Sequence, residues 1–142
     1  MYMSPDMTCL SCSVTPLTGQ RRDGKKRVLI IDDEYLIRYS LQKLIEQEGY
    51  QVFTAASGQE GLRLFEKQKP DIVILDIRLP DTNGLALLIT FKEISPSAIV
   101  IMATGCPDER SSEEALKMGA LDYLEKPVNI GTLKNLMQAA RL

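Results

Sequence analysis

The chain has 142 residues, of which 44% are hydrophobic, so it is long enough to bury the core of one domain. Its formal net charge is -2, which excludes the strong basic excess typical of nucleic-acid-binding domains, and we expect no direct binding of nucleic acid. The chain contains no histidine, which excludes Ser-His-Asp and Cys-His catalysis and imidazole metal sites. Any chemistry must therefore depend on carboxylates, hydroxyls and lysine.

Cysteine content and hydropathy bear on the cellular compartment. Three cysteines are an odd number, unlike the disulfide framework of a small secreted domain. No run of about 18 apolar residues is present, and the amino terminus lacks the continuous apolar core of a signal peptide. We therefore expect a soluble, cytoplasmic protein that does not interact with a membrane.

Residues 1–26 are rich in Ser, Thr, Pro and Gly and show no apolar period, which predicts a disordered N-terminal extension before a folded domain of residues 27–142. The extension contains a Cys-x-x-Cys pair, Cys9 and Cys12. A zinc site needs a second such pair, whereas only Cys106 remains, so we interpret the pair as inert.

From residue 27 onward, short apolar runs alternate with stretches of helical periodicity. Five continuous runs are typical of strands buried on both faces: residues 28–31, 52–55, 72–75, 99–103 and 121–124. Five helices are predicted after them: residues 34–48, 57–67, 83–94, 108–118 and 129–140. The first ends at Gly49, which suits a left-handed cap, and the second begins with Ser57 and Glu60 at the spacing of a capping box.

Five such β-then-α units predict an α/β fold, a doubly wound, five-stranded parallel sheet with helices on both faces. In this architecture ligands bind at the carboxyl ends of the strands, where the strand order reverses. Polar side chains follow four of the predicted strands at that edge: Asp32, Asp33, Glu34, Asp76, Thr104 and Lys126. We expect them to share one site.

Carboxylates gathered at one edge repel each other unless a cation neutralises them. A hard cation such as Mg²⁺ suits such oxygen ligands and keeps waters that a phosphoryl group can replace. A lysine and a hydroxyl could bind the other phosphoryl oxygens, and the central carboxylate could be the nucleophile. The residue types therefore indicate phosphoryl chemistry that uses Mg²⁺ as the cofactor.

Three blocks of the sequence resemble the signature blocks of two-component response-regulator receiver domains. They are residues 28–34 (VLIIDDE), residues 71–84 (DIVILDIRLPDTNG) and residues 119–127 (GALDYLEKP). Each block alone is a weak signal, but their order and their placement at strand ends make them jointly specific. The resemblance covers about residues 26–142 and implies a flavodoxin-like fold with strand order 2-1-3-4-5 and five helices.

The resemblance implies that Asp76 is the phosphorylated aspartate. It also implies that Mg²⁺ is held by Asp33, by Asp32 mainly through water, by Asp76 and by the backbone carbonyl of Arg78. Glu34 would extend the acidic pocket. The phosphoryl donor would be a sensor histidine kinase or a histidine phosphotransfer protein, and the chain would catalyse only its own phosphorylation and dephosphorylation.

The resemblance further implies a switch. Thr104 and Lys126 would bind phosphoryl oxygens, and Tyr123 would change rotamer as Thr104 moves. This movement would alter the face made by the fourth helix, fifth strand and fifth helix, where a partner, an output domain or a second receiver would bind. A cis peptide bond between Lys126 and Pro127 would point the lysine into the pocket.

Alternatives remain at this stage. Asp32 and Asp33 could serve the start of the next helix through its dipole, Thr104 could bond locally, and Tyr123 could be an ordinary half-buried residue. A binding module of the same fold would lack an acidic, acceptor or lysine residue, and none is missing. A phosphohydrolase would need Asp-x-Asp after the first strand, and a flavodoxin-type carrier would need a Ser/Thr phosphate loop there.

The blocks also resemble, more weakly, the receivers of transcriptional activators that bear an ATPase domain. The cognate kinase, the signal, the output and the oligomeric state cannot be read from the sequence.

Overall fold

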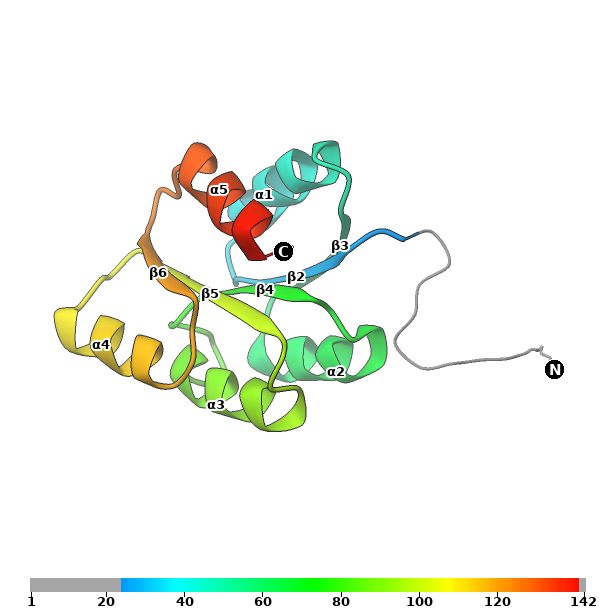
Figure 1. Ribbon diagram of the computed structural model, residues 1–142. Helices are drawn as coiled ribbons and strands as arrows, with labels where there is room; N and C mark the ends of the chain where they lie inside the picture. Colours follow the sequence, from blue (N-terminus) through cyan, green and yellow to red (C-terminus); the bar gives the residue numbers. More distant parts are fainter. Residues whose placement is uncertain (1–23, 141–142) are drawn as a thin grey trace, which may run out of the picture.

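The computed structural model describes residues 24–140, which form a parallel sheet with helices on both faces (Figure 1). The strands of this part of the chain are β2 (Arg27–Ile31), β3 (Gln51–Ala55), β4 (Ile72–Leu75), β5 (Ile99–Thr104) and β6 (Asp122–Glu125). The helices are α1 (Tyr35–Gln47), α2 (Gly58–Gln68), α3 (Gly84–Ile94), α4 (Glu109–Lys117) and α5 (Ile130–Ala140). Cys9, Cys12 and nearly all of the predicted N-terminal extension lie outside the described residues.

The strand order is β3-β2-β4-β5-β6, and every neighbouring pair is parallel. In order along the chain this is 2-1-3-4-5, so the predicted topology is confirmed. The order reverses at β2, which pairs with β3 on one side and β4 on the other. None of the helices within residues 24–140 is long and apolar enough to span a bilayer.

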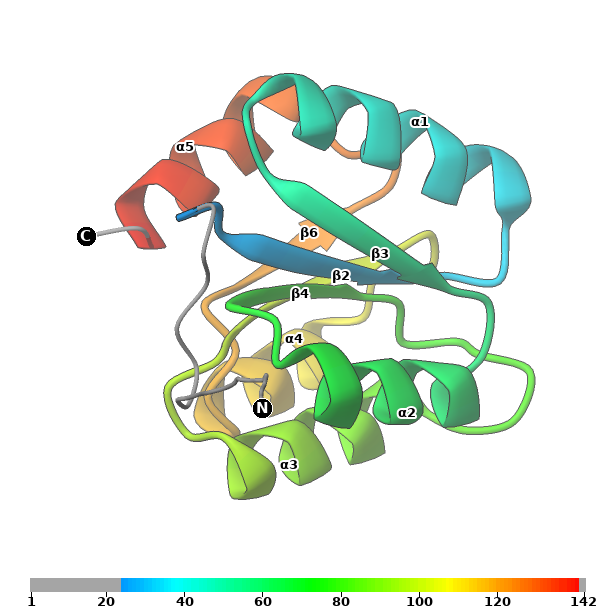
Figure 2. The same ribbon diagram turned by 90° about the vertical axis from the view of Figure 1, so that its right-hand side faces the viewer.

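Helices α2, α3 and α4 cover one face of the sheet, and α1 and α5 cover the other (Figure 2). A separate hydrophobic core lies on each face. Leu29 and Ile31 of β2 join the core beneath α2, α3 and α4, whereas Val28 and Ile30 join the core beneath α1 and α5. Successive side chains of a strand point to opposite faces, so a strand covered on both sides needs apolar residues throughout. This explains the continuous apolar runs in the sequence.

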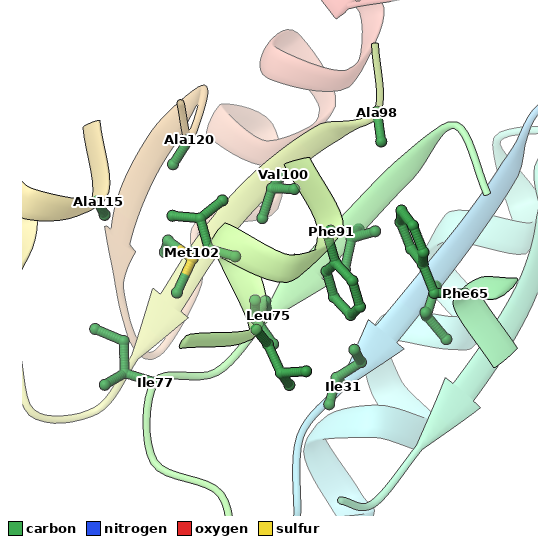
Figure 3. Close-up of a cluster of buried hydrophobic side chains, with 14 of the residues drawn as sticks. Ile31, Phe65, Leu75, Ile77, Phe91, Ala98, Val100, Met102, Ala115 and Ala120 are labelled. Atoms are coloured by element: carbon green, nitrogen blue, oxygen red, sulfur yellow. The ribbon is translucent and has the colours of Figure 1, made fainter. Parts of the chain in front are cut away.

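The larger core contains two stacked phenylalanines (Figure 3). Phe65 of α2 stacks on Phe91 of α3 with ring centroids 4.2 Å apart and an interplanar angle of 13°. The helices contribute unequally: α3 buries Leu87, Leu88 and Phe91, whereas Ala115 is the one residue that α4 buries. Apolar packing therefore holds α3 much more firmly than α4.

The edge strands differ from the prediction. All or nearly all residues of β2, β4 and β5 are buried, but β3 and β6 are mostly half-buried. Leu121, predicted to begin the last strand, lies before β6 and is 41% exposed. An edge strand has a neighbour on one side only, so helices cover it less completely.

The predicted helix ends are largely confirmed. Gly49 follows α1 with a φ of 95°, a left-handed conformation that glycine adopts without steric cost. At the start of α2 the Ser57 hydroxyl accepts a hydrogen bond from the Glu60 N–H at 3.2 Å. The reciprocal bond differs from a standard capping box, because the Glu60 carboxylate accepts from the N–H of Ala56 at 3.0 Å.

Candidate functional site

The backbone ladder brings the predicted site residues to one edge of the sheet. Asp32 follows β2 and Asp76 follows β4, directly after the paired residues Ile31 and Leu75. The Asp76 N–H donates to the Ile31 carbonyl at 3.0 Å, and the Lys126 N–H donates to the Thr104 carbonyl at 2.8 Å. Neighbouring strands therefore place the carboxylates and the lysine in one pocket.

Three carboxylates form the acidic part of this pocket. One oxygen each of Asp32, Asp33 and Asp76 lies within 4.8 Å of the other two. Asp32 and Asp76 are buried, whereas Asp33 is exposed. A few carboxylate oxygens with one side open to water are the ligands that Mg²⁺ favours. The donor set therefore fits the predicted cation.

Asp32 also makes local hydrogen bonds just before α1. Its Oδ1 accepts a hydrogen bond from the Glu34 N–H at 2.9 Å, just before α1. Its carbonyl accepts from the Arg38 guanidinium at 2.7 Å. The bond from Glu34 orients the Asp32 carboxylate, and the bond from Arg38 holds its backbone. A dipole role of Asp32 and Asp33 at the start of α1 stays a prediction.

Lys126 is the cation of the pocket. Its Nζ donates to Oδ2 of Asp76 at 3.0 Å and to Oδ2 of Asp32, and it lies 3.7 Å from a carboxylate oxygen of Glu34. The Lys126–Pro127 peptide bond is cis, as predicted. One ammonium group thus faces several carboxylates, which leaves the pocket with excess negative charge.

Burial and pairing act on these groups in opposite directions. Burial raises the pKa of Asp76 above its ordinary value of 3.8, although the hydrogen bond and charge of Lys126 act to lower it. Burial acts to lower the pKa of Lys126, but hydrogen bonds to Asp32 and Asp76 outweigh it and raise the pKa above 10.5. The lysine is therefore protonated at neutral pH.

The two predicted switch residues both contact the loop between β5 and α4. Thr104 is buried, and its Oγ1 accepts a hydrogen bond from the Cys106 N–H at 3.2 Å. The Tyr123 hydroxyl accepts from the N–H of Asp108, the N-cap residue of α4, at 3.3 Å. A hydroxyl that accepts one hydrogen bond can still donate its own proton, so Thr104 can also bind a phosphoryl oxygen.

Arg78 is exposed and follows Asp76 by two residues. Its N–H donates to Oδ1 of Asp76 at 3.2 Å, which helps to orient that carboxylate. The role of its carbonyl as a cation ligand stays a prediction.

Two residues near the acceptor were missed by the sequence analysis. The Asp81 carboxylate accepts hydrogen bonds from the N–H groups of Gly58 at 2.8 Å and Gln59 at 2.9 Å, and these bonds hold its pKa below 3.8. Gly84 packs against the acceptor backbone, because a Cβ there would lie 2.2 Å from the Asp76 carbonyl oxygen. Gly84 could have been suspected from the Asn-Gly pair, but no local signal links Asp81 to a helix more than twenty residues away.

Comparisons with known proteins agree with this geometry. Residues 28–138 match the sequence model of the response regulator receiver domain. Over 113 residues the chain is 34% identical to sporulation initiation phosphotransferase F of Bacillus subtilis, covering 80% of this chain and 91% of that protein. It is 33% identical over 114 residues to regulatory protein AtoC of Escherichia coli, covering 80% of this chain but 25% of that longer protein.

Solved structures agree as well. A CheY-like response regulator receiver domain protein from Methanospirillum hungatei superposes with a TM-score of 0.79 at 35% identity, covering 83% of this chain and 95% of that chain. A chain of the CheX-CheY-BeF3-Mg²⁺ complex from Borrelia burgdorferi gives a TM-score of 0.78 at 28% identity, covering 87% and 96%. The family inferred from the three sequence blocks is confirmed: the chain belongs to the response regulator receiver domains of two-component systems.

Proposed function

We propose that Asp76 accepts a phosphoryl group in a Mg²⁺-dependent reaction. The observation that carries the proposal is the position of this buried carboxylate, between the Lys126 ammonium and the carboxylates of Asp32 and Asp33. An oxygen of Asp76 forms the new bond to phosphorus, while the bond between phosphorus and the donor's leaving atom breaks.

Positioning and charge supply the rest of the chemistry. Lys126 binds a phosphoryl oxygen through its protonated amine, and Thr104 binds another through its hydroxyl. Bound by Asp32, Asp33, Asp76 and the Arg78 carbonyl, Mg²⁺ would neutralise charge that builds up on the phosphoryl oxygens. The Borrelia complex contains BeF3 and Mg²⁺ together, and BeF3 has the shape of a phosphoryl group, which supports this assignment.

We propose a phosphohistidine donor, supplied by a sensor histidine kinase or a histidine phosphotransfer protein. The 142 residues contain no histidine, so the imidazole of the donor lies outside them. The relative named sporulation initiation phosphotransferase F is consistent with this phosphotransfer role. The chain acts on no other substrate and catalyses only its own phosphorylation and dephosphorylation.

We propose that phosphorylation is signalled to other proteins or domains through the face made by α4, β6 and α5. Phosphorylation draws Thr104 toward the phosphoryl group and lets Tyr123 turn inward, which removes the hydroxyl acceptor from the N–H of Asp108. Ala115 is the one residue that α4 buries, so the helix can shift at little cost in apolar burial. A partner, an output domain or a second receiver would bind the altered face, in a shift between two pre-existing states.

We further propose a domain boundary near residue 27, a cytoplasmic location, and no direct contact with nucleic acid or membrane. The domain is also proposed to be the receiver of a transcriptional activator.

Intact-mass spectrometry after incubation with acetyl phosphate and Mg²⁺ tests the acceptor. We expect the addition of one phosphoryl group, and its loss in Asp76→Asn or after chelation of the cation. Asp122→Asn is the matched control, because Asp122 lies at the opposite end of β6 from Lys126 and should leave phosphorylation unchanged. An undiminished yield in Asp76→Asn would overturn the assignment.

A further inference from the structure

The loop between β4 and α3 begins at the proposed acceptor and carries Arg78, whose carbonyl is the proposed cation ligand. The loop closes on itself: Arg78 and Asn83 form an isolated antiparallel bridge, and the Leu79 N–H donates to the Thr82 carbonyl at 3.3 Å. At its far end the Gly84 N–H donates to the Ile77 carbonyl at 2.7 Å. A displacement at the tip of this closed loop therefore reaches Arg78.

Asp81 attaches the tip of the loop to a different element. Its two carboxylate oxygens accept separate hydrogen bonds from Gly58 and Gln59, the first two residues of α2. These N–H groups belong to the first turn, where a helix has no carbonyl partners of its own and carries partial positive charge. The third N–H group of this turn, that of Glu60, donates to the Ser57 hydroxyl. The start of α2 is thus capped by one residue next to it and one from the acceptor loop.

Helix α2 is itself a fixed reference for the site. Gly61 packs closely on the end of β2, since a Cβ there would lie 2.5 Å from the Ile31 side chain. Asp32 and Asp33 follow that same strand end. Through α2, Asp81 therefore ties the loop that carries Arg78 to the strand that carries the other carboxylates.

We propose that Asp81 is a positioning residue of the phosphoacceptor pocket, which holds the Arg78 carbonyl and the Asp76 carboxylate in register with Asp32 and Asp33 for cation binding. The inference rests on the proposed function and adds a residue that touches neither cation nor phosphoryl group.

The test compares two caps of the same helix. Asp81→Ala removes the contact to the acceptor loop, whereas Ser57→Ala removes the local cap and leaves the loop attached. Asp81→Asn removes the same charge as Asp81→Ala but keeps one oxygen acceptor. Two quantities are measured on the full, unphosphorylated chain: the dissociation constant for Mg²⁺ alone, by calorimetry, and the hydrogen exchange of the Gly58 and Gln59 amides, by NMR.

Both alanine variants should speed exchange at the start of α2. Asp81→Ala should weaken Mg²⁺ binding by about tenfold, in the range found when a residue that orients a metal ligand is lost. We expect less than about a twofold change for Ser57→Ala and an intermediate loss for Asp81→Asn, since it loses the charge but keeps part of the cap. Thermal unfolding checks that each variant is folded at the temperature of the titration.

Equal Mg²⁺ dissociation constants for Asp81→Ala and Ser57→Ala would overturn the inference. Equal constants for Asp81→Ala and Asp81→Asn would also overturn it, because the loss of binding would then come from the lost charge and not from the lost cap. Unchanged exchange at Gly58 and Gln59 in Asp81→Ala would show that the cap is not made. A wild-type chain that binds no Mg²⁺ would instead contradict the proposed function itself.

Discussion

Replacing Lys126 by methionine should destabilise the cation-free protein and at the same time tighten its binding of Mg²⁺. Methionine keeps the unbranched apolar stem and removes the charge. The side chains of Lys126, Asp32 and Asp76 are 9%, 4% and 7% exposed, so the two carboxylates would lose their partner in a largely buried setting. The same substitution frees the Asp32 and Asp76 oxygens that the ammonium occupies, and these are proposed cation ligands.

The magnitude follows from the contact distances. At 3.0 Å, the separation of Lys126 Nζ and Asp76 Oδ2, an effective dielectric constant of about 20 gives an attraction of about 5 kcal/mol. Part of this is offset, because the ammonium no longer has to be desolvated and the open side of the pocket admits water. We therefore expect a net loss of about 3 kcal/mol, the lower end for breaking a buried ion pair. Mg²⁺ at about 100 times its dissociation constant restores about 2.7 kcal/mol.

Urea denaturation followed by circular dichroism, in chelator and in a series of Mg²⁺ concentrations, measures both effects. Lys134→Met is the matched control, because Lys134 pairs with Glu48 at 3.1 Å with side chains 43% and 35% exposed. That surface pair should contribute less than about 1 kcal/mol, and its loss should not alter the response to Mg²⁺. Equal destabilisation of the two variants, or weaker Mg²⁺ binding by Lys126→Met, would refute the reasoning.

Three further predictions concern the pocket and its loops. Asp76→Asn should stabilise the cation-free fold at neutral pH. Burial raises the pKa of Asp76 in the folded state, so ionisation of this carboxyl lowers the free energy of unfolding as pH rises through that pKa. Urea denaturation at several pH values should show the extra stability of the variant fading below the folded-state pKa of Asp76. Tyr123→Phe should speed hydrogen exchange of the Asp108 amide by removing its acceptor, and an unchanged rate would argue against that contact. Cys106→Glu and Arg78→Asn should each speed loss of the phosphorylated mass after donor removal. The native thiol and guanidinium are poorly suited to orient a water that attacks the phosphoryl group. Decay of the wild-type phosphoprotein as fast as that of both variants would reject this explanation.

The fold was predictable because its signals are local and repeated. The apolar runs around Leu29, Val73 and Ile101 mark strands covered on both faces, and their alternation with helices leaves few topologies. Once the strands are known to be parallel, Asp32 and Asp76 must meet at one edge, even though 44 positions separate them in the sequence. The contact between Lys126 and these carboxylates follows from the same rule.

The caps of α2 and the exposure of Leu121 could not be predicted, because they depend on contacts that no local sequence pattern records. Asp81 is an exposed acidic residue in a turn, and only the three-dimensional arrangement reveals that it caps α2. The Glu60 carboxylate bonds to Ala56 instead of completing the usual box, a choice set by the path of the chain between β3 and α2. The exposed position of Leu121 likewise reflects coverage of an edge strand, which composition does not encode.

The unequal burial of the helices should make local unfolding start at α4. With Ala115 as its one buried residue, α4 can detach from the sheet while β5 and the Phe65–Phe91 stack stay intact. Local unfolding of this kind costs far less than unfolding the domain, so a small fraction of molecules has α4 open at any moment. Within the folded domain from residue 27 onward, a protease at low concentration should therefore cleave first between residues 105 and 121. A partner that binds α4 would protect this segment by stabilising the closed form.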